Sequence, residues 1–391
     1  MTKLATRAVR AGIDCDPAYG AVTPPIVLSA NFTFDELGKK RAYDYGRSGN
    51  PTRDQLADAL ASLEGGVGGI ITSTGMSAIA LVVQALVTPG DRVLIPHDCY
   101  GGTWRLFKAL AERGAFELEV VDFTRAESAE KALARKARLV WIETPSNPLL
   151  RITNITEVAS AAKVAGALVV ADNTFLSPAL QRPIEHGADV VVHSTTKFIN
   201  GHSDVVGGAV IAADAAVLEE IGWWANALGL VGSPFDSFLT LRGLRTLNAR
   251  QRVHEENTKA VAEILGQHRA VSRLYYPGCV GHPGHAIARK QQDGFGSLIS
   301  FELAGAEDAV RRFVSGLQCI SLAESLGGVE SLISHPTTMS HASMDECARQ
   351  TAGILPGLLR FSVGIEDPDD LVADLISALD RAAQPALKEA C

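Results

Sequence analysis

The chain has 391 residues, of which 47% are hydrophobic and 20% are charged, and its net charge is −8. This composition is typical of a globular protein with more than one core, and the acidic balance excludes a basic surface for nucleic acid or for an anionic membrane. No apolar signal segment and no apolar run of membrane length occurs, so we expect a cytoplasmic protein without a membrane partner. The six cysteines are scattered without metal-site spacing, which indicates reduced thiols.

The first segment, 1–50, is rich in Gly and Pro and lacks helical periodicity. Such a segment seldom folds alone, so we expect an arm that contacts a neighbouring subunit. Near its end, Tyr45 and Arg47 stand two residues apart, which puts both side chains on one face of an extended chain. There they could grip a phosphate together, although the local sequence by itself favours a solvated turn.

From residue 51 the patterns of strands and helices alternate. Asn50 and Pro51 are typical of a helix start, and a predicted strand at 69–73 leads into Thr74-Gly75-Met76-Ser77. The free amides of a helix that begins there would form an anion site, and Gly75 would let a ligand approach the backbone. The alternation predicts a mostly parallel, doubly wound sheet in a large domain, 51–250. Further strands are predicted at 92–96, 118–121, 139–143, 167–172, 189–193 and 206–212, and helices at 102–114 and 155–165.

The remainder, 251–391, predicts a smaller α+β domain. Its strand at 358–363 contains Arg360 among apolar neighbours. A buried arginine needs an anion, which an amino-acid carboxylate or a structural ion pair could supply, and both interpretations stay open at this point. The other predicted elements of this domain are helices at 254–268, 308–317 and 367–383, and strands at 271–275 and 297–303.

The residues that follow the buried strand at 189–193 carry the strongest chemical signal. Ser194, Thr195 and Thr196 precede Lys197, at the carboxyl end of a strand, where open α/β sheets place their ligands. Lysine is the side chain that holds an aldehyde as a Schiff base, and hydroxyl groups suit a phosphate. Asp172 ends the preceding strand and could hold a pyridinium nitrogen. Pyridoxal phosphate needs this combination, so the sequence predicts an enzyme that uses it.

A set of motifs spread over nearly the whole chain resembles the Cys/Met-metabolism family of pyridoxal-phosphate enzymes, with the closest likeness to its bacterial cystathionine γ-synthases. The resemblance implies the aspartate-aminotransferase-like fold (fold type I), with a mostly parallel doubly wound sheet and a smaller C-terminal α+β domain. It also implies a homotetramer built from dimers that share active sites. The motifs are Tyr45-x-Arg47, Ser73-Thr-Gly-Met-Ser-Ala78, Asp98-Cys-Tyr-Gly-Gly102, Glu143-Thr-Pro-Ser-Asn-Pro148, Val170-Ala-Asp-Asn-Thr174, Ser194-Thr-Thr-Lys-Phe198, the stretch 322–332 and Leu359-Arg-Phe-Ser-Val-Gly364.

The resemblance further implies a role for each matched residue. Lys197 would carry the cofactor and move protons, Asp172 would pair with the pyridinium nitrogen, and Tyr100 would stack on the ring. The phosphate would be held by Gly75, Met76, Ser194 and Thr196, joined across a subunit contact by Tyr45 and Arg47, which reverses the solvated-turn interpretation of that pair. The substrate α-carboxylate would be held by Arg360, Asn147 and the Ser325 backbone, and the distal pocket would be lined by Arg105 and Glu324.

The reaction implied is γ-replacement, in which cysteine displaces the acyloxy group of O-succinyl- or O-acetyl-homoserine to give cystathionine in methionine biosynthesis. Cystathionine γ-lyase and O-acylhomoserine sulfhydrylase stay open as alternatives, because an acidic Glu324 suits a γ-acting pocket in either direction. A β-lyase is disfavoured, since a neutral residue is expected there. A non-catalytic nicotinamide-binding protein is also disfavoured, because no GxGxxG follows an early strand. Cys279, His282 and His285 give only weak support for zinc, so no metal is predicted.

Overall fold

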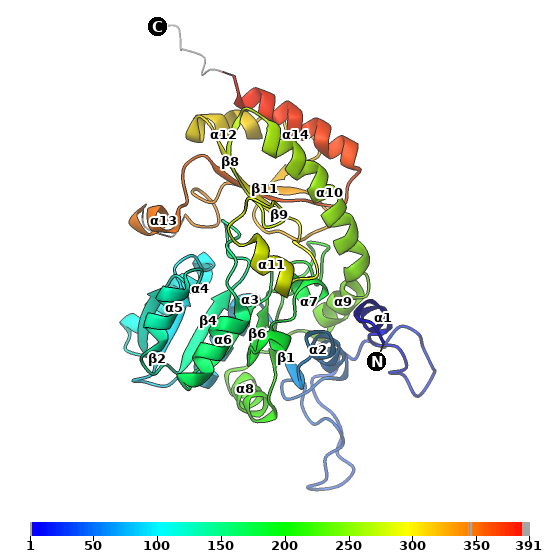
Figure 1. Ribbon diagram of the computed structural model, residues 1–391. Helices are drawn as coiled ribbons and strands as arrows, with labels where there is room; N and C mark the ends of the chain where they lie inside the picture. Colours follow the sequence, from blue (N-terminus) through cyan, green and yellow to red (C-terminus); the bar gives the residue numbers. More distant parts are fainter. Residues whose placement is uncertain (1, 343, 345, 385–391) are drawn as a thin grey trace. The chain divides into compact units, whose positions relative to one another are not determined.

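The structure, a computed structural model, describes residues 2–342, 344 and 346–384 (Figure 1). The chain folds into two compact units. The first unit comprises residues 1–96, 106–142 and 154–248, and the second comprises 97–105, 143–153 and the chain from 249 onward. Within the described residues, no helix combines the length and the apolar character that spanning a bilayer requires.

A seven-stranded sheet in the order β1-β7-β6-β5-β4-β2-β3 forms the centre of the first unit. Strand β2 pairs in parallel with β3 and β4, and β5 pairs in parallel with β6, whereas β7 runs antiparallel to both β1 and β6. The prediction of an α/β protein with a mostly parallel sheet is confirmed, with β7 as the exception. The strands are β1 Gly68–Thr72, β2 Arg92–Pro96, β3 Glu117–Val121, β4 Leu139–Glu143, β5 Leu168–Asp172, β6 Val190–His193 and β7 Gly208–Ala212.

Helices cover the sheet, which is why its central strands are apolar along their whole length. Every residue of β4, β6 and β7 is buried, as expected of strands that are covered on both faces. Helix α2 packs on β1 and β7, and α3 packs on β6 and β7. The helices of this part of the chain are α1 Leu4–Arg10, α2 Pro51–Glu64, α3 Gly75–Leu86, α4 Gly101–Glu112, α5 Ala126–Leu133, α6 Ile155–Val164, α7 Ser177–Leu180, the 3-10 turn η1 Pro183–His186, α8 Ala215–Leu228 and α9 Pro234–Leu244.

The ends of α2 and α3 follow from their capping residues. The side chain of Asn50 accepts hydrogen bonds from the amides of Thr52 and Arg53, and Gly65 ends α2 in the left-handed conformation (φ 81°). At the start of α3, the Thr74 hydroxyl accepts from the Ser77 amide at 2.8 Å. The predicted cap of α2 is thereby confirmed, and the first turn of α3 is fixed beside the end of β1.

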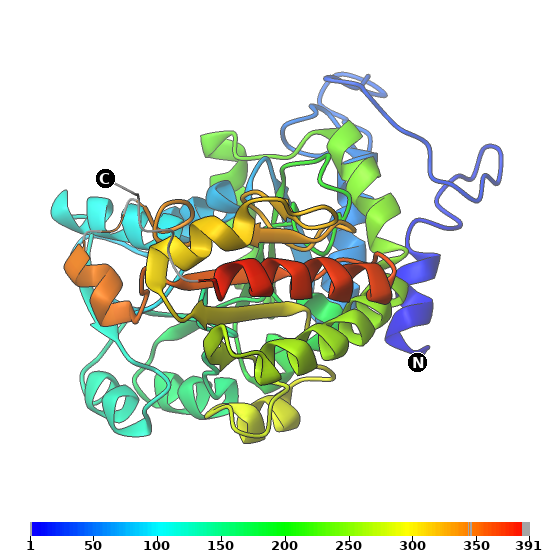
Figure 2. The same cartoon turned by 90° about the horizontal axis from the view of Figure 1, so that it is seen from above.

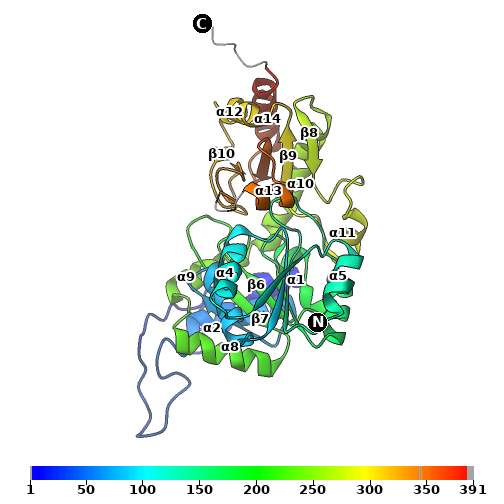
Figure 3. The same ribbon diagram turned by 90° about the vertical axis from the view of Figure 1, so that its left-hand side faces the viewer.

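The segment between α1 and α2 is irregular and extends away from the sheet (Figures 1 and 3). Helix α1 was not expected from the sequence, and it is only seven residues long, with Ala8 buried. Several large apolar side chains of the irregular segment are exposed, among them Tyr19, Val22, Leu28 and Leu37. Large apolar side chains that are exposed in this number on one segment suit a surface that another chain covers.

The second unit is built on a five-stranded sheet in the order β10-β11-β12-β9-β8, antiparallel except between β10 and β11. Helices α12 and α14 pack side by side and share one apolar core with the sheet, including Phe301, Phe313 and Phe361 (Figure 2). Helix α10 begins seven residues before its predicted start. The elements are α10 Leu247–Gln267, β8 Val271–Tyr275, α11 His285–Gln291, β9 Leu298–Leu303, α12 Ala306–Val314, β10 Ser321–Leu322, β11 Leu332–Ser334, α13 Glu346–Ala352, β12 Leu358–Ser362 and α14 Pro368–Ala382.

The close approach of α9 to the turn after Lys197 yields a first prediction. A Cβ atom on Gly243 would overlap the backbone carbonyl of the buried Asn200, whereas one on Gly222 in α8 would come no nearer than 3.7 Å to Ile70. We expect Gly243→Ala to lower the free energy of unfolding by about 1–3 kcal/mol, because backbone atoms cannot give way cheaply. The matched Gly222→Ala variant should gain up to about 1 kcal/mol, since alanine is the better helix former.

Urea denaturation of the two variants and the parent protein measures this difference. Equal stability of Gly243→Ala and Gly222→Ala would contradict the close packing of α9 on the lysine turn.

Candidate active site

Three strand ends of the first unit come together at one edge of its sheet. Because β7 is antiparallel to both β1 and β6, β1 runs in the same direction as β6, and β5 is parallel to β6. The carboxyl ends of β1, β5 and β6 therefore share an edge. These ends lead to the start of α3, to Asp172 and to Ser194 with Lys197, which therefore lie at one edge, whereas Tyr100, another predicted cofactor residue, belongs to the second unit.

The start of α3 lies against the residue that follows β6. A Cβ atom on Gly75 would stand only 2.8 Å from Cβ of Ser194 and 3.1 Å from its hydroxyl oxygen. The Ser194 hydroxyl is thereby held beside the amino end of a twelve-residue helix, where amides are free and the helix dipole is positive. Met76 is the second residue of this helix, and the Thr196 hydroxyl accepts from the Gly207 amide at 3.0 Å. Amides and hydroxyls arranged in this way could hold a phosphate.

Asp172 is a half-buried carboxylate at the end of β5. Burial raises its pKa above the usual value, while hydrogen bonds from Thr174 and the charge of His193 act in the opposite direction. The Thr174 amide donates to Oδ1 of Asp172 at 3.0 Å. A carboxylate in such surroundings would be stabilised in its ionised form by a cationic nitrogen, which is the chemistry expected of a pyridinium partner.

The backbone around Lys197 is fixed by a tight turn. The Lys197 amide donates to the Ser194 carbonyl at 3.3 Å, and the Gly201 amide donates to the Lys197 carbonyl at 2.8 Å. The next residue, Phe198, is fully buried, and so is nearly all of Asn200. The lysine side chain, which is half-buried, therefore starts from a position that the fold determines tightly.

Tyr45 and Arg47 lie together on the arm of the first unit. The Arg47 guanidinium is 5.6 Å from the centroid of the Tyr45 ring, and Tyr45 is 50% exposed. One amino group of Arg47 donates to Oδ1 of Asn226 at 2.8 Å. The two side chains are thus neighbours, as their spacing suggests. Within the described residues, neither side chain forms a hydrogen bond or ion pair with the start of α3.

In the second unit, the buried Arg360 is surrounded by neutral acceptors. Its two terminal nitrogens donate to Oδ1 of Asn147 and to the Ser325 carbonyl, each at 2.9 Å. Its Nε atom is buried and has no hydrogen-bond partner among the described residues. Burial lowers its pKa to about 10, opposed by the charge of Glu324. A buried guanidinium that makes no hydrogen bond to a carboxylate among the described residues is suited to bind the carboxylate of a ligand.

The remaining predicted residues of the second unit differ in how closely they join Arg360. Ser325 has a φ of 91°, a strained conformation for a side chain other than glycine, and its carbonyl is the one that Arg360 uses. Glu324 and Tyr100 both act electrostatically on Arg360. Arg105, in the first turns of α4, is exposed and makes no hydrogen bond or ion pair with any other residue that the structure describes.

Two residues near this group were missed as candidates from the sequence. Glu143 accepts a hydrogen bond from the Tyr100 amide at 2.8 Å and so holds the start of α4. His341 is buried, its pKa is lowered to about 4 by burial and by the charge of Arg360, and its Nδ1 lies 2.9 Å from the Ser340 hydroxyl. The signal for Glu143 was available, since it ends an apolar strand. His341 lies in an irregular loop, where no sequence pattern distinguishes it.

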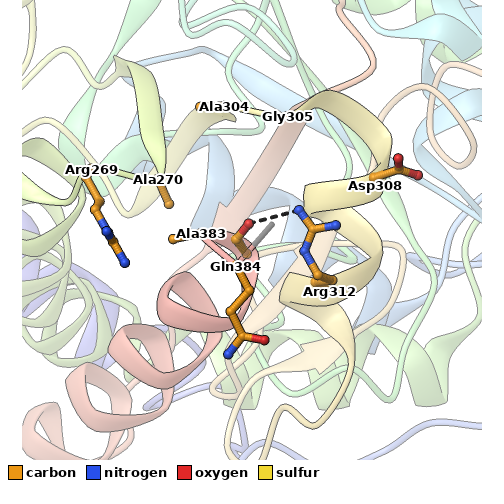
Figure 4. Close-up of a pocket in the computed structure, with 9 residues that line it drawn as sticks. Arg269, Ala270, Ala304, Gly305, Asp308, Arg312, Ala383 and Gln384 are labelled. Carbon is orange, nitrogen blue, oxygen red and sulfur yellow. Dashed lines mark hydrogen bonds between the residues drawn. The ribbon is translucent and has the colours of Figure 1, made fainter. Parts of the chain in front are cut away.

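A pocket elsewhere in the second unit has a structural explanation. Arg269, Asp308 and Arg312 line it beside the last turn of α14 (Figure 4). Arg312 donates to the Ala382 carbonyl at 3.1 Å, so its charge caps the negative end of that helix. None of the predicted site residues lies there.

The weak zinc candidate is the group Cys279, His282 and His285. Within the described residues, no group of three potential metal ligands occurs, and Nδ1 of His285 is engaged with the Pro277 carbonyl at 2.7 Å. Cys15, Cys99, Cys279 and Cys319 are free thiols, whereas Cys391 lies outside the described residues.

Comparison with known proteins identifies the family. Residues 5–380 match the family described as Cys/Met metabolism PLP-dependent enzyme. The chain belongs to this family. It is therefore an enzyme that depends on pyridoxal 5′-phosphate, as the strand ends at Asp172 and Lys197 predicted, and the aminotransferase-like fold expected from the resemblance is confirmed by its structural neighbours.

Three relatives illustrate the range of similarity. A cystathionine gamma-synthase of Escherichia coli K12 is 53% identical over 95% of this chain and 97% of the relative. A cystathionine beta-lyase of Lactococcus lactis subsp. cremoris is 45% identical over 97% of this chain and all of the relative. The crystal structure of cystathionine gamma synthase from Xanthomonas oryzae pv. oryzae in complex with cystathionine is 64% identical, covers 98% of this chain and 99% of its own, and has a TM-score of 0.97.

The residues at the sheet edge fit the cofactor. The hydroxyl of Ser194 and the free amides at the start of α3 provide donors for a phosphate, and the side-chain-free Gly75 leaves the approach to them open. The raised pKa of Asp172 shows a carboxylate that a cationic ring nitrogen would stabilise.

The narrow space at Gly75 yields a second prediction. The methyl group of Gly75→Ala would press on Ser194 and displace the hydroxyl from the helix start. We expect the affinity for pyridoxal phosphate to fall by about tenfold or more, which corresponds to 1.4 kcal/mol or more of lost binding free energy. The measurement is the dissociation constant of pyridoxal phosphate, obtained by absorbance as the cofactor is added back to the apoprotein of the variant and of the parent.

Gly222→Ala serves as the control, because its methyl group meets only ordinary van der Waals contacts. Unchanged cofactor affinity in Gly75→Ala would mean that the phosphate is held somewhere else.

Proposed function

We propose that the enzyme is a cystathionine γ-synthase, which replaces the acyloxy group of an O-acylhomoserine by the thiol of L-cysteine and releases the acid. The observation that carries the substrate class is Arg360, a buried guanidinium whose hydrogen bonds within the described residues go to neutral oxygens. An amino-acid α-carboxylate would supply the missing anion in a bidentate pair. The Asn147 side chain and the Ser325 backbone would then orient the substrate through Arg360.

Lys197 is proposed as the group that both tethers the cofactor and moves protons. Bound pyridoxal phosphate supplies an aldehyde that joins the substrate amine and a ring that withdraws electrons from the substrate Cα. Lys197 would remove the proton from Cα and then act at Cβ, which permits the acyloxy group to leave from Cγ. One amine can perform these transfers because they occur on one side of the substrate. Tyr100 would stack on the cofactor ring, and Arg105 and Glu324 would line the distal pocket.

Asp172 would keep the ring nitrogen protonated, and the phosphate would be held by Gly75, Met76, Ser194 and Thr196. The helix start at α3 supports this assignment, since it combines free amides with adjacent hydroxyls. A protonated ring nitrogen withdraws electrons more strongly, so Asp172 would act on the reaction without touching the substrate.

The choice of synthase over lyase rests on similarity. The relatives named as synthases are 53% and 64% identical, compared with 45% for the β-lyase, and all of these matches cover at least 95% of this chain. Glu324 adds a chemical argument against a β-lyase, because an acidic group suits a pocket that acts at Cγ. The synthase of Xanthomonas oryzae binds cystathionine, the proposed product.

The arm and the assembly complete the proposal. We propose that residues 1–50 form an arm on a neighbouring subunit, that 51–250 form the cofactor domain and that 251–391 form the smaller domain. Tyr45 and Arg47 would reach the cofactor phosphate of that neighbour in a cytoplasmic homotetramer. The exposed apolar side chains of the arm, such as Leu28 and Leu37, support such a contact, because water contact with them is unfavourable.

A comparison of substrates tests the reaction. Purified holoenzyme should form cystathionine rapidly from cysteine and either O-succinylhomoserine or O-acetylhomoserine, and should cleave cystathionine slowly. Loss of one general base lowers a rate by roughly 10²–10⁴-fold. Lys197→Ala should lower kcat by more than this, because the covalent attachment of the cofactor is lost as well. Lys163→Ala, which changes an exposed lysine on α6, is the control.

Cystathionine formation and cleavage are to be compared as kcat/KM. Fast cleavage to cysteine and 2-oxobutyrate with negligible synthesis would identify a γ-lyase, and release of pyruvate would identify a β-lyase. Sulfide used in preference to cysteine would identify a sulfhydrylase. Each of these results replaces the synthase proposal.

Substitution of the buried guanidinium tests the carboxylate site separately. Arg360→Lys keeps the charge but cannot donate to Asn147, Ser325 and a carboxylate in the same geometry. We expect KM for the O-acylhomoserine to rise by about tenfold or more, with a smaller change in kcat, since a lost hydrogen bond to a charged group is worth roughly 1.5–3 kcal/mol. Arg273→Lys, at an exposed position of β8, should leave both constants unchanged. A fall in kcat at constant KM would assign Arg360 to another step.

A further inference from the structure

A cluster of buried polar side chains lies directly behind the ends of β5 and β6. His193 Nε2 is 2.6 Å from Oε1 of Glu64, and the Asn173 side chain donates to the same oxygen at 2.8 Å. Asn173 also exchanges hydrogen bonds with Gln181 through its side-chain amide. Glu64, Asn173 and His193 are all 0% exposed. The cluster therefore joins the last residue of α2 to the last residue of β6 and to the residue that follows β5.

The fold alone gives no good reason for a carboxylate at this position. Glu64 is the last residue of α2, where the helix dipole disfavours a negative charge, and it is completely buried. Its second oxygen, Oε2, has no hydrogen-bond partner among the described residues, and Nδ1 of His193 has none either. Well-packed apolar side chains would commonly be as stable as a buried ion pair. A carboxyl group kept under these conditions points to a use other than stability.

The cluster is adjacent to the residue that is proposed to pair with the cofactor ring. Asp172 directly precedes Asn173, and it pairs in register with Val192, which directly precedes His193. The Asn173 amide donates to the Val192 carbonyl at 3.0 Å, so the two strand ends move as one piece. The charge of His193 lowers the pKa of Asp172 and so counteracts the effect of burial. Opposite His193 on its other side, β7 presents the apolar Ala209.

We propose that Glu64 and His193 are positioning residues for Asp172, in which the Glu64 carboxylate keeps a proton on His193 and the His193 cation keeps Asp172 ionised. Together with the ring nitrogen, the charges alternate along the series Glu64, His193, Asp172 and pyridinium. The neutral Asn173 donates to the Glu64 carboxylate, and Gln181 holds Asn173 in turn. This inference rests on the proposed pairing of Asp172 with the ring nitrogen, and it does not depend on which amino acid the enzyme converts.

The expected effect has a definite direction. Removal of the positive charge in His193→Gln favours the protonated form of Asp172, which then holds the proton of the ring nitrogen less well. Glu64→Gln acts in the same direction, because a buried imidazolium without its counter-ion gives up its proton more readily. A ring without its positive charge withdraws fewer electrons from the nitrogen of Lys197 that carries the cofactor. That nitrogen becomes more basic, so the pH midpoint at which the visible absorption band of the bound cofactor changes should rise.

The experiment uses holoenzyme without amino-acid substrate and records this midpoint and the dissociation constant of pyridoxal phosphate. We expect each single variant to raise the midpoint by roughly one pH unit and to weaken cofactor binding by about tenfold. The double variant should shift the midpoint no further than one single variant, because Glu64 acts on Asp172 through His193. His254→Gln, at a buried histidine of the second unit that is bonded to the Val363 carbonyl, is the matched control.

The control should lose stability without moving the midpoint. Variants of Glu64 and His193 that melt at lower temperature but keep the parental midpoint and cofactor affinity would overturn the inference and leave the pair with a structural role. Asp172→Asn distinguishes the two levels of the argument: if it too keeps the parental midpoint, the pairing of Asp172 with the ring is wrong and the inference falls with it. Glu64→Gln preserves the shape of the side chain and keeps the test decisive if His193→Gln does not fold.

Discussion

The alignment of strand ends in the first unit is the constraint on which the rest of the structure depends. Asp172 and Lys197 are separated by a crossover of only a four-residue helix and a 3-10 turn, yet the parallel pairing of β5 with β6 brings both to one sheet edge. The pairing of Val190 with Val170 and of Val192 with Asp172 fixes the register. A slip by one residue would turn every side chain of a strand to the opposite face, so the buried valines of β6 also protect the register.

Glycines make this edge of the sheet compact. Added side chains on Gly75, Gly207 or Gly208 would press on Ser194, Thr195 or the backbone of Thr74 respectively. These contacts bring the turn after β1, the residues after β6 and the start of β7 into one layer. The antiparallel β7 is what allows this, because its first residues arrive where β1 and β6 end. Local close packing and the anion site thus have the same cause.

The sequence predicts features that depend on neighbours along the chain more reliably than those that depend on distant contacts. The cap at Asn50, the apolar strands and their polar ends follow from local patterns. Asp172 and Lys197 could be proposed as cofactor residues because Asp172 ends one such strand and Lys197 lies in the turn after another. The antiparallel direction of β7 could not be predicted, since an apolar run reads the same in both directions. Glu64 lies 129 residues from His193 in sequence, and a glutamate at a helix end is usually exposed. The interaction of Arg360 with Asn147 likewise depends on chain pairing across 213 residues.

Two of the buried ionisable residues, Glu64 and Arg360, differ in where their partners come from. Glu64 is paired within the chain, with His193 on β6 and with the residue after β5, so it contributes to a fixed arrangement. The hydrogen bonds of Arg360 within the described residues go to neutral oxygens, and one of these belongs to the strained residue Ser325. The second unit consequently keeps a desolvated cation that an anion from outside the chain would stabilise. Any substitution that supplied an internal carboxylate would stabilise that unit and weaken its affinity for ligands of the same charge, which is why stability and binding oppose each other at this position.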